Sequence, residues 1–225
     1  MSVPTSRLAP LSSQGIMKAV DDFTAFVLAG GKSTRMGVDK TLLELKGKSL
    51  LGRALDLLRS ITPEVIIVGE RSKFTRIGFV VEDVFRERGP LGGIHAALAA
   101  TATELNLVLA VDLPFVEAGF LKYLLKVAAE NTALVTLPRT SAGWQPLCAV
   151  YRREFGMLAE RSLLQGKNKI DPLFAGVEIH PIDEAEITRR GFSAAMFRNL
   201  NTPEEFESAK RQRSQVMKTY RGTDA

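Results

Sequence analysis

Unbroken apolar runs alternate along the chain with segments in which apolar residues recur every three or four positions. The unbroken runs predict buried strands, because strands of a parallel sheet are covered by helices on both faces. The runs cover residues 23–29, 65–69, 107–111 and 133–137, and further extended segments are expected at 79–83, 145–151 and 177–182.

The intervening segments predict helices. The clearest has apolar residues at helical spacing after the N-cap candidate Ser49: Leu50, Leu51, Ala54, Leu55 and Leu58. Others are expected after residue 93, at 120–127, at about 153–164 and from Thr202, where a proline and acidic residues follow an N-cap. Strands that alternate with helices predict an α/β fold, with a doubly wound, mostly parallel sheet in three α/β/α layers.

Length and composition fit one such domain. The chain has 225 residues, of which 45% are hydrophobic. We expect a disordered leader at residues 1–20, a single domain at 21–213 and a basic tail at 214–225. The net charge is +5, and much of the excess lies after residue 209. No aromatic residues interleave that late charge as in a single-strand binder, so we expect a solvated helix end and no nucleic-acid partner.

The single cysteine, Cys148, excludes an intrachain disulfide. It lies in an apolar run, which favours a small buried hydrophobe over a nucleophile. No stretch is as long as the ~18 apolar residues of a membrane span, and the Ser- and Pro-containing first 15 residues contain no apolar core of a signal peptide. We therefore expect a cytoplasmic protein without a membrane partner.

A basic, glycine-rich loop follows the first apolar run. It begins at Gly30 and Gly31 and contains Lys32, Arg35 and Lys40. Adjacent glycines let the backbone approach a ligand, and successive N–H groups form an anion site. The loop lacks the glycine spacing of a P-loop or of a dinucleotide-binding fingerprint. We interpret it as a polyphosphate site, with an ordinary basic turn as the alternative.

Asp112 directly follows the most apolar run in the chain. At the carboxyl end of a strand, its carboxylate is placed to hold Mg²⁺, which prefers one or two carboxylates together with phosphate oxygens and water. The alternative is a turn residue before Pro114. The polyphosphate loop at a neighbouring strand end favours the metal site.

Five sequence blocks together resemble the molybdenum cofactor guanylyltransferases, within the wider Rossmann-like nucleotidyltransferase fold. The blocks are Leu28–Lys40, Gly89–Gly93, Val111–Phe115, Gln145–Leu147 with Tyr151, and Asn199–Pro203. The resemblance covers nearly all of the chain after about residue 23. The family usually has Cys where Val111 stands, a departure that should be harmless.

The resemblance implies a role for each matching position. GTP would be contacted by Leu28, Ala29, Gly30, Gly31 and Lys40, with Asp83 close to the nucleotide. The base and ribose would be bordered by Gly89, Pro90, Leu91 and Gly92. Asp112 would bind Mg²⁺, and the pterin side of the cleft would be lined by Gln145, Pro146, Asn199 and Asn201. The implied partners are GTP, molybdopterin and proteins of the cofactor pathway.

The implied chemistry needs no general base. The terminal phosphate of molybdopterin is ionised at neutral pH, attacks the α-phosphorus of GTP and expels pyrophosphate, whose charge Lys40 and Arg35 would offset. Positioning and electrostatic stabilisation would then supply the catalysis. The two histidines, His95 and His180, are accordingly interpreted as structural. Trp144 either stacks on a flat ligand or packs in the core or a lid.

Two alternatives remain open at this point. A cytidylyltransferase of the same pathway would share the fold, but such relatives tend to have Ala-Gly in the first loop and to lack Asp39. The Gly30-Gly31 pair and Asp39 therefore favour guanine. A nucleotide-binding module without catalysis is the second alternative, and the presence of both Lys40 and Asp112 speaks against it.

Overall fold

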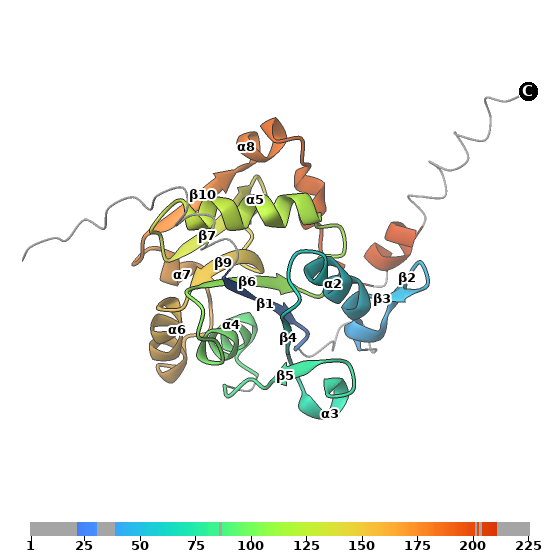
Figure 1. The fold of residues 1–225 in the computed structure, drawn as a ribbon, viewed down its shortest axis with the longest axis horizontal. Coiled ribbons are helices and arrows are strands. Elements are labelled where there is room, and N and C mark those ends of the chain that lie inside the picture. Colours follow the sequence, from blue (N-terminus) through green and yellow to red (C-terminus); the bar gives the residue numbers. More distant parts are fainter. Residues whose placement is uncertain (1–21, 31–38, 86, 201, 203, 211–225) are drawn as a thin grey trace, which may run out of the picture.

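The computed structural model describes residues 22–30, 39–85, 87–200, 202 and 204–210. The expected leader, the expected tail, and the predicted site residues Gly31, Arg35 and Asn201 lie outside the described residues. Figure 1 shows a central twisted sheet between layers of helices.

The sheet has the strand order β10-β7-β9-β6-β1-β4-β5, and β8 pairs with β7. Its strands are β1 (Phe23–Leu28), β4 (Val65–Val68), β5 (Phe79–Val81), β6 (Leu105–Ala110), β7 (Val135–Thr140), β8 (Gly143–Trp144), β9 (Cys148–Arg152) and β10 (Ile179–Asp183). Strand β1 pairs in parallel with β4 and β6, β4 pairs in parallel with β5, and β10 with β7. β9 is antiparallel to β6 and β7, and β8 to β7, so the sheet is mostly parallel, as predicted.

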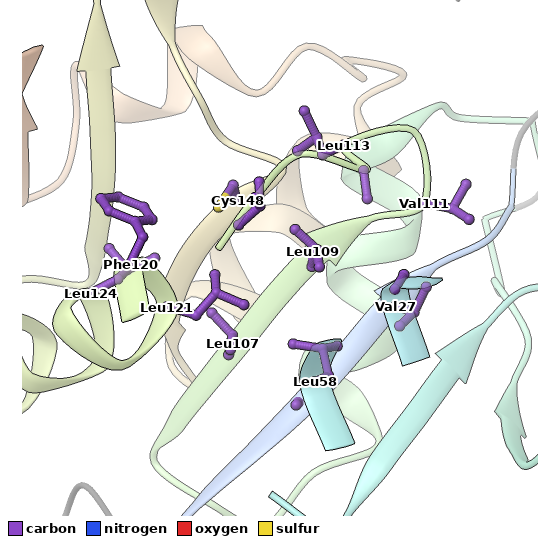
Figure 2. Packing of buried hydrophobic residues seen from close by; sticks show 14 of the residues in the cluster. Val27, Leu58, Leu107, Leu109, Val111, Leu113, Phe120, Leu121, Leu124 and Cys148 are labelled. Carbon is purple, nitrogen blue, oxygen red and sulfur yellow. The ribbon is translucent and has the colours of Figure 1, made fainter. Parts of the chain in front are cut away.

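Successive residues of β1 pack on opposite faces of the sheet. Ala25 and Val27 belong to a core cluster with α2 (Leu50–Arg59) and α5 (Ala118–Ala129). Phe26 and Leu28 belong to a second cluster with α4 (Pro90–Ala99) and α6 (Phe155–Leu164). Figure 2 shows the first cluster, in which side chains of β1 and β6 meet those of the helices. This alternation confirms the three-layer α/β/α architecture.

The helix caps predicted from the sequence are present. Ser49 Oγ accepts a hydrogen bond from Gly52 N at 3.1 Å at the start of α2. At the last helix, residues 204–210, Thr202 Oγ1 accepts from Glu205 N at 3.2 Å, and the Glu205 carboxylate accepts from Thr202 N at 3.0 Å. This reciprocal pair is a capping box, and it fixes where the final helix begins.

Short elements were not predicted, because they contain too few residues to show a period. They are the helices α3 (Arg71–Phe74), α7 (Asp171–Phe174) and α8 (Glu184–Arg189), and the 3-10 turns η1 (Lys40–Leu42) and η2 (Ala194–Phe197). A turn that contains Gly47 joins the two strands of a hairpin, β2 (Glu44–Leu45) and β3 (Lys48–Ser49). The strand expected at 79–83 ends at Val81.

Cys148 is fully buried, and burial raises the pKa of its thiol. Its prediction as a small core residue is confirmed. Among the helices of the described residues, none is long and apolar enough to span a bilayer.

Candidate active site

Four neighbouring parallel strands end at the same edge of the sheet, and backbone hydrogen bonds join the segments that follow them. Ala29 N donates to Val68 O at 2.9 Å, Val111 N to Leu28 O at 3.1 Å, and Gly69 N to Val81 O at 2.9 Å. The segments that contain Gly30 and Asp112 therefore start side by side, and the segment that contains Asp83 starts at the same edge on the far side of Gly69. This is the edge at which α/β sheets bind ligands.

Lys40 and Asp112 meet at this edge. Lys40 Nζ lies 3.7 Å from Asp112 Oδ2, and both side chains are about a fifth exposed, at 20% and 18%. The other carboxylate oxygen, Asp112 Oδ1, is buried and has no hydrogen-bond partner among the described residues. Burial raises the pKa of Asp112, and the Lys40 ammonium opposes that rise only in part. A buried carboxylate oxygen without a donor fits a ligand of a hard cation.

Among the described residues, Asp112 does not belong to a cluster of metal-ligating side chains. The described residues contain no group of three or more His, Cys, Asp or Glu side chains that could hold a metal ion. A site with one carboxylate suits Mg²⁺, since that ion takes its remaining ligands from substrate phosphates and water.

Asp39 fixes the turn on which Lys40 lies. Asp39 Oδ1 accepts from Thr41 N at 3.0 Å and from Thr41 Oγ1 at 2.7 Å, which caps η1. Asp39 Oδ2 accepts from Lys73 Nζ on α3 at 3.2 Å. Partial burial alone would raise the pKa of Asp39, but the hydrogen bonds from Thr41 and Lys73 outweigh it and lower that pKa. The contact of Lys73 with Asp39 was not predicted, because the two residues are 34 positions apart and belong to no common sequence motif.

Asp83 lies against the first turn of α4. The helix expected after residue 93 begins earlier, at Pro90, so of residues 89–93 only Gly89 lies outside it, with φ +67°. A side-chain carbon on Gly92 would lie 2.4 Å from Asp83 Oδ2, so only glycine admits this approach. Asp83 Oδ1 accepts from Phe85 N at 2.8 Å. Burial raises the pKa of Asp83.

His95 lies one helical turn further along α4. It is buried, and its ring packs edge-on against Phe85 with the ring centroids 5.0 Å apart. This packing agrees with the prediction of a structural histidine. His180 lies in β10, at the far end of the sheet from β1.

Two of the segments predicted for the pterin side flank Asp112. Leu200 N donates to Asp112 O at 3.1 Å, which places the exposed Asn199 next to this residue. On the other side of the strand end, Ala110 N donates to Leu147 O at 2.8 Å. Both segments therefore border the candidate site.

Polar groups of the 145–147 segment form hydrogen bonds within their own hairpin. Gln145 Nε2 donates to Thr140 Oγ1 at 3.2 Å, and Pro146 O accepts from Tyr151 OH at 2.8 Å. Their substrate contacts stay a prediction.

Trp144 packs on protein groups. Its ring lies edge-on to Phe174 with centroids 6.0 Å apart, and Arg139 Cζ lies 5.0 Å from its centroid. The structure thus supports packing for Trp144. A cavity of about 480 Å³ lies between α6 and α7, and none of the predicted site residues lines it.

Comparison with known proteins shows the family and the fold. A family model described as a MobA-like NTP transferase domain matches residues 25–178. A probable molybdenum cofactor guanylyltransferase of Pelotomaculum thermopropionicum is 34% identical, with 83% of this chain and 91% of the relative covered. A molybdenum cofactor guanylyltransferase of Syntrophotalea carbinolica is 31% identical, with 84% and 91% covered.

Among solved structures, molybdopterin-guanine dinucleotide biosynthesis protein A of Archaeoglobus fulgidus superposes with a TM-score of 0.75. It is 26% identical, and the match covers 85% of this chain and 99% of that one. The expected fold and enzyme class are therefore confirmed. The chain belongs to the MobA-like NTP transferase family of nucleotidyltransferases.

Proposed function

We propose that this enzyme transfers GMP from GTP to the terminal phosphate of molybdopterin, releases pyrophosphate and forms the guanine dinucleotide cofactor. The observation that carries the proposal is the Lys40–Asp112 pair, which joins a cation to a carboxylate with a buried, unsatisfied oxygen at the ligand-binding edge. The relatives named as molybdenum cofactor guanylyltransferases supply the choice of substrates.

The phosphates of GTP would lie over the end of β1. Gly30 is exposed there, and a side-chain carbon on it would lie 3.8 Å from Val68 O, so the backbone is open to a ligand. The Lys40 ammonium would contact the phosphates, while Asp112 would hold Mg²⁺. When bound, Mg²⁺ neutralises phosphate charge and orients the phosphate oxygens.

The base would lie toward α4. The Asp83 carboxylate is half-buried on Gly92 and accepts hydrogen bonds only, when ionised. Guanine presents N–H donors on its Watson–Crick edge, and a buried acceptor left without them would be costly. This contact would make Asp83 a determinant of base choice.

In the transfer itself, an oxygen of the acceptor phosphate bonds to the α-phosphorus as the bond from that phosphorus to the β-phosphate oxygen breaks. The acceptor oxygen has no proton to lose at neutral pH, so no side chain needs to act as a base. Lys40 would offset the charge that develops on the leaving pyrophosphate, and a role of Arg35 in this step stays a prediction. Asn199, with Gln145 and Pro146, would border the pterin.

The substrate-binding part of the proposal can be tested by thermal shift with GTP, CTP, ATP and UTP, each with Mg²⁺. A ligand that binds only the native state raises the melting temperature by mass action. We expect the largest rise with GTP. An equal rise with CTP would favour a cytidylyltransferase, and binding of GTP without turnover in the presence of molybdopterin would favour a module that lacks catalysis. Proteins of the cofactor pathway are further expected partners.

A further inference from the structure

The short helix α3 connects the two halves of the candidate nucleotide site. Its Phe74 is 2% exposed and packs on Gly69, at the end of β4. The packing is so close that a side-chain carbon on Gly69 would lie 2.8 Å from the Phe74 ring. Because Gly69 is itself hydrogen-bonded to Val81, this anchor is continuous with the sheet. The packing of Phe74 against the core therefore fixes the position of α3.

From this anchor, α3 makes one contact to each side of the site. On the base side, Arg71 N donates to Glu82 Oε1 at 3.1 Å, next to Asp83. On the phosphate side, Lys73 Nζ donates to Asp39 Oδ2 at 3.2 Å. Lys73 Nζ also lies 3.1 Å from Glu70 Oε2, within its own segment.

The contact on the phosphate side ends at Lys40. Asp39 uses one oxygen for Lys73 and the other for Thr41, and the second contact caps the turn that begins with Lys40. Lys40 in turn lies beside Asp112. A continuous set of contacts thus runs from the core-anchored α3 through Asp39 to the cation expected at the phosphates.

We propose that Lys73 is a positioning residue for nucleotide transfer, and that it acts by holding Asp39 so that the turn of Lys40 stays aimed at the phosphates. The proposal rests on the proposed function for its reaction, but the contacts it invokes are independent of the acceptor. Lys73 itself need not touch the substrate, since its ammonium contacts the carboxylates of Asp39 and Glu70. The energetic signature of such a role is coupling between residues 73 and 39.

A double-mutant cycle measures that coupling. The variants are Lys73→Met, Asp39→Asn and the double variant, with Glu70→Gln as the matched control, because Glu70 is the other carboxylate paired with Lys73. We expect Lys73→Met to lower kcat/KM by about 3- to 10-fold, in the lower part of the range seen for coupled neighbours. In the Asp39→Asn background the same change should have almost no effect. Lys73→Arg should restore most of the activity, and Glu70→Gln should be silent.

Two readouts separate positioning from a loss of stability. The melting temperatures of Lys73→Met and Glu70→Gln should be similar, since exposed ion pairs contribute little, while only the first variant should lose kcat. Effects of Lys73→Met and Asp39→Asn that multiply in the double variant would overturn the proposal, as would a silent Lys73→Met. If the wild-type enzyme transfers no GMP, the proposed function is contradicted, and the same cycle measured on the dissociation constant of GTP still decides the positioning role.

Discussion

Gly92 and Asp83 approach each other so closely that no side chain fits between them. A carbon on Gly92 would lie 2.4 Å from Asp83 Oδ2 and 2.9 Å from Oδ1, although the two residues belong to different elements. The first turn of α4 therefore packs against the Asp83 carboxylate, which we propose contacts the base of GTP. The glycine is present for this contact and not for helix formation, which it weakens.

The substitution Gly92→Ala should displace Asp83 and weaken GTP binding by about 10-fold, the equivalent of one hydrogen bond to a charged group. Equilibrium titration with GTP in the presence of Mg²⁺ measures the effect. Gly119→Ala, in α5, is the matched control, since its added carbon would lie 3.4 Å from the Phe192 ring, an ordinary van der Waals contact. Equal affinity in both variants would show that Asp83 does not read the base.

Asp112→Asn should abolish most turnover and yet stabilise the fold. The raised pKa means that the folded state holds this proton more tightly than the unfolded state does, so ionised Asp112 costs stability at pH values above its pKa. The amide removes that cost, and a gain of about 1 kcal/mol, or about 2–4 °C in Tm, is expected at neutral pH. The gain should shrink as the pH falls. A lower Tm at neutral pH would contradict this account of the site.

Nucleotide binding should be lost on acidification earlier than for an ordinary aspartate. Mg²⁺ requires the ionised carboxylate, and burial raises the pKa of Asp112 above its usual 3.8. The acid limb of kcat/KM reports groups of the free enzyme, so its midpoint should lie above that value. Asp39 does not produce this limb, because its pKa is lowered, whereas Asp83, whose pKa burial also raises, would contribute to it. A limb at or below 3.8 would assign the titration to another group.

Lys40→Ala should lower kcat/KM for GTP by about 100- to 1,000-fold, the scale seen when one preorganised charge donor is removed. Part of the loss should appear in kcat, because the charge on pyrophosphate grows in the transition state. Lys48→Ala is the control, since Lys48 is 46% exposed and pairs with Asp56 at the surface. The comparison uses steady-state kinetics at fixed Mg²⁺ and ionic strength. Losses of similar size in the two variants would place the phosphate contact elsewhere.

The strands and the meeting of Lys40 with Asp112 were predictable, because apolar runs mark buried strands and the carboxyl ends of parallel strands share one edge. The start of α4 was not, since its glycines are typical of a loop, although Pro90 at the first helical position and the buried Leu91 are consistent with a helix. The role of Lys73 could not be predicted from the sequence for a different reason. Its contact with Asp39 depends on how a helix of four residues packs on Gly69, which no local pattern encodes.

The most direct test of the account is the transfer reaction itself. Purified enzyme is incubated with Mg²⁺, molybdopterin and GTP labelled at the α-phosphate, and both the labelled dinucleotide and pyrophosphate are quantified. We predict one pyrophosphate released for each GMP joined to the pterin, no release without molybdopterin, and little product when CTP replaces GTP. Transfer of label from CTP at the rate seen with GTP, or pyrophosphate release without a labelled pterin product, would contradict the proposed function.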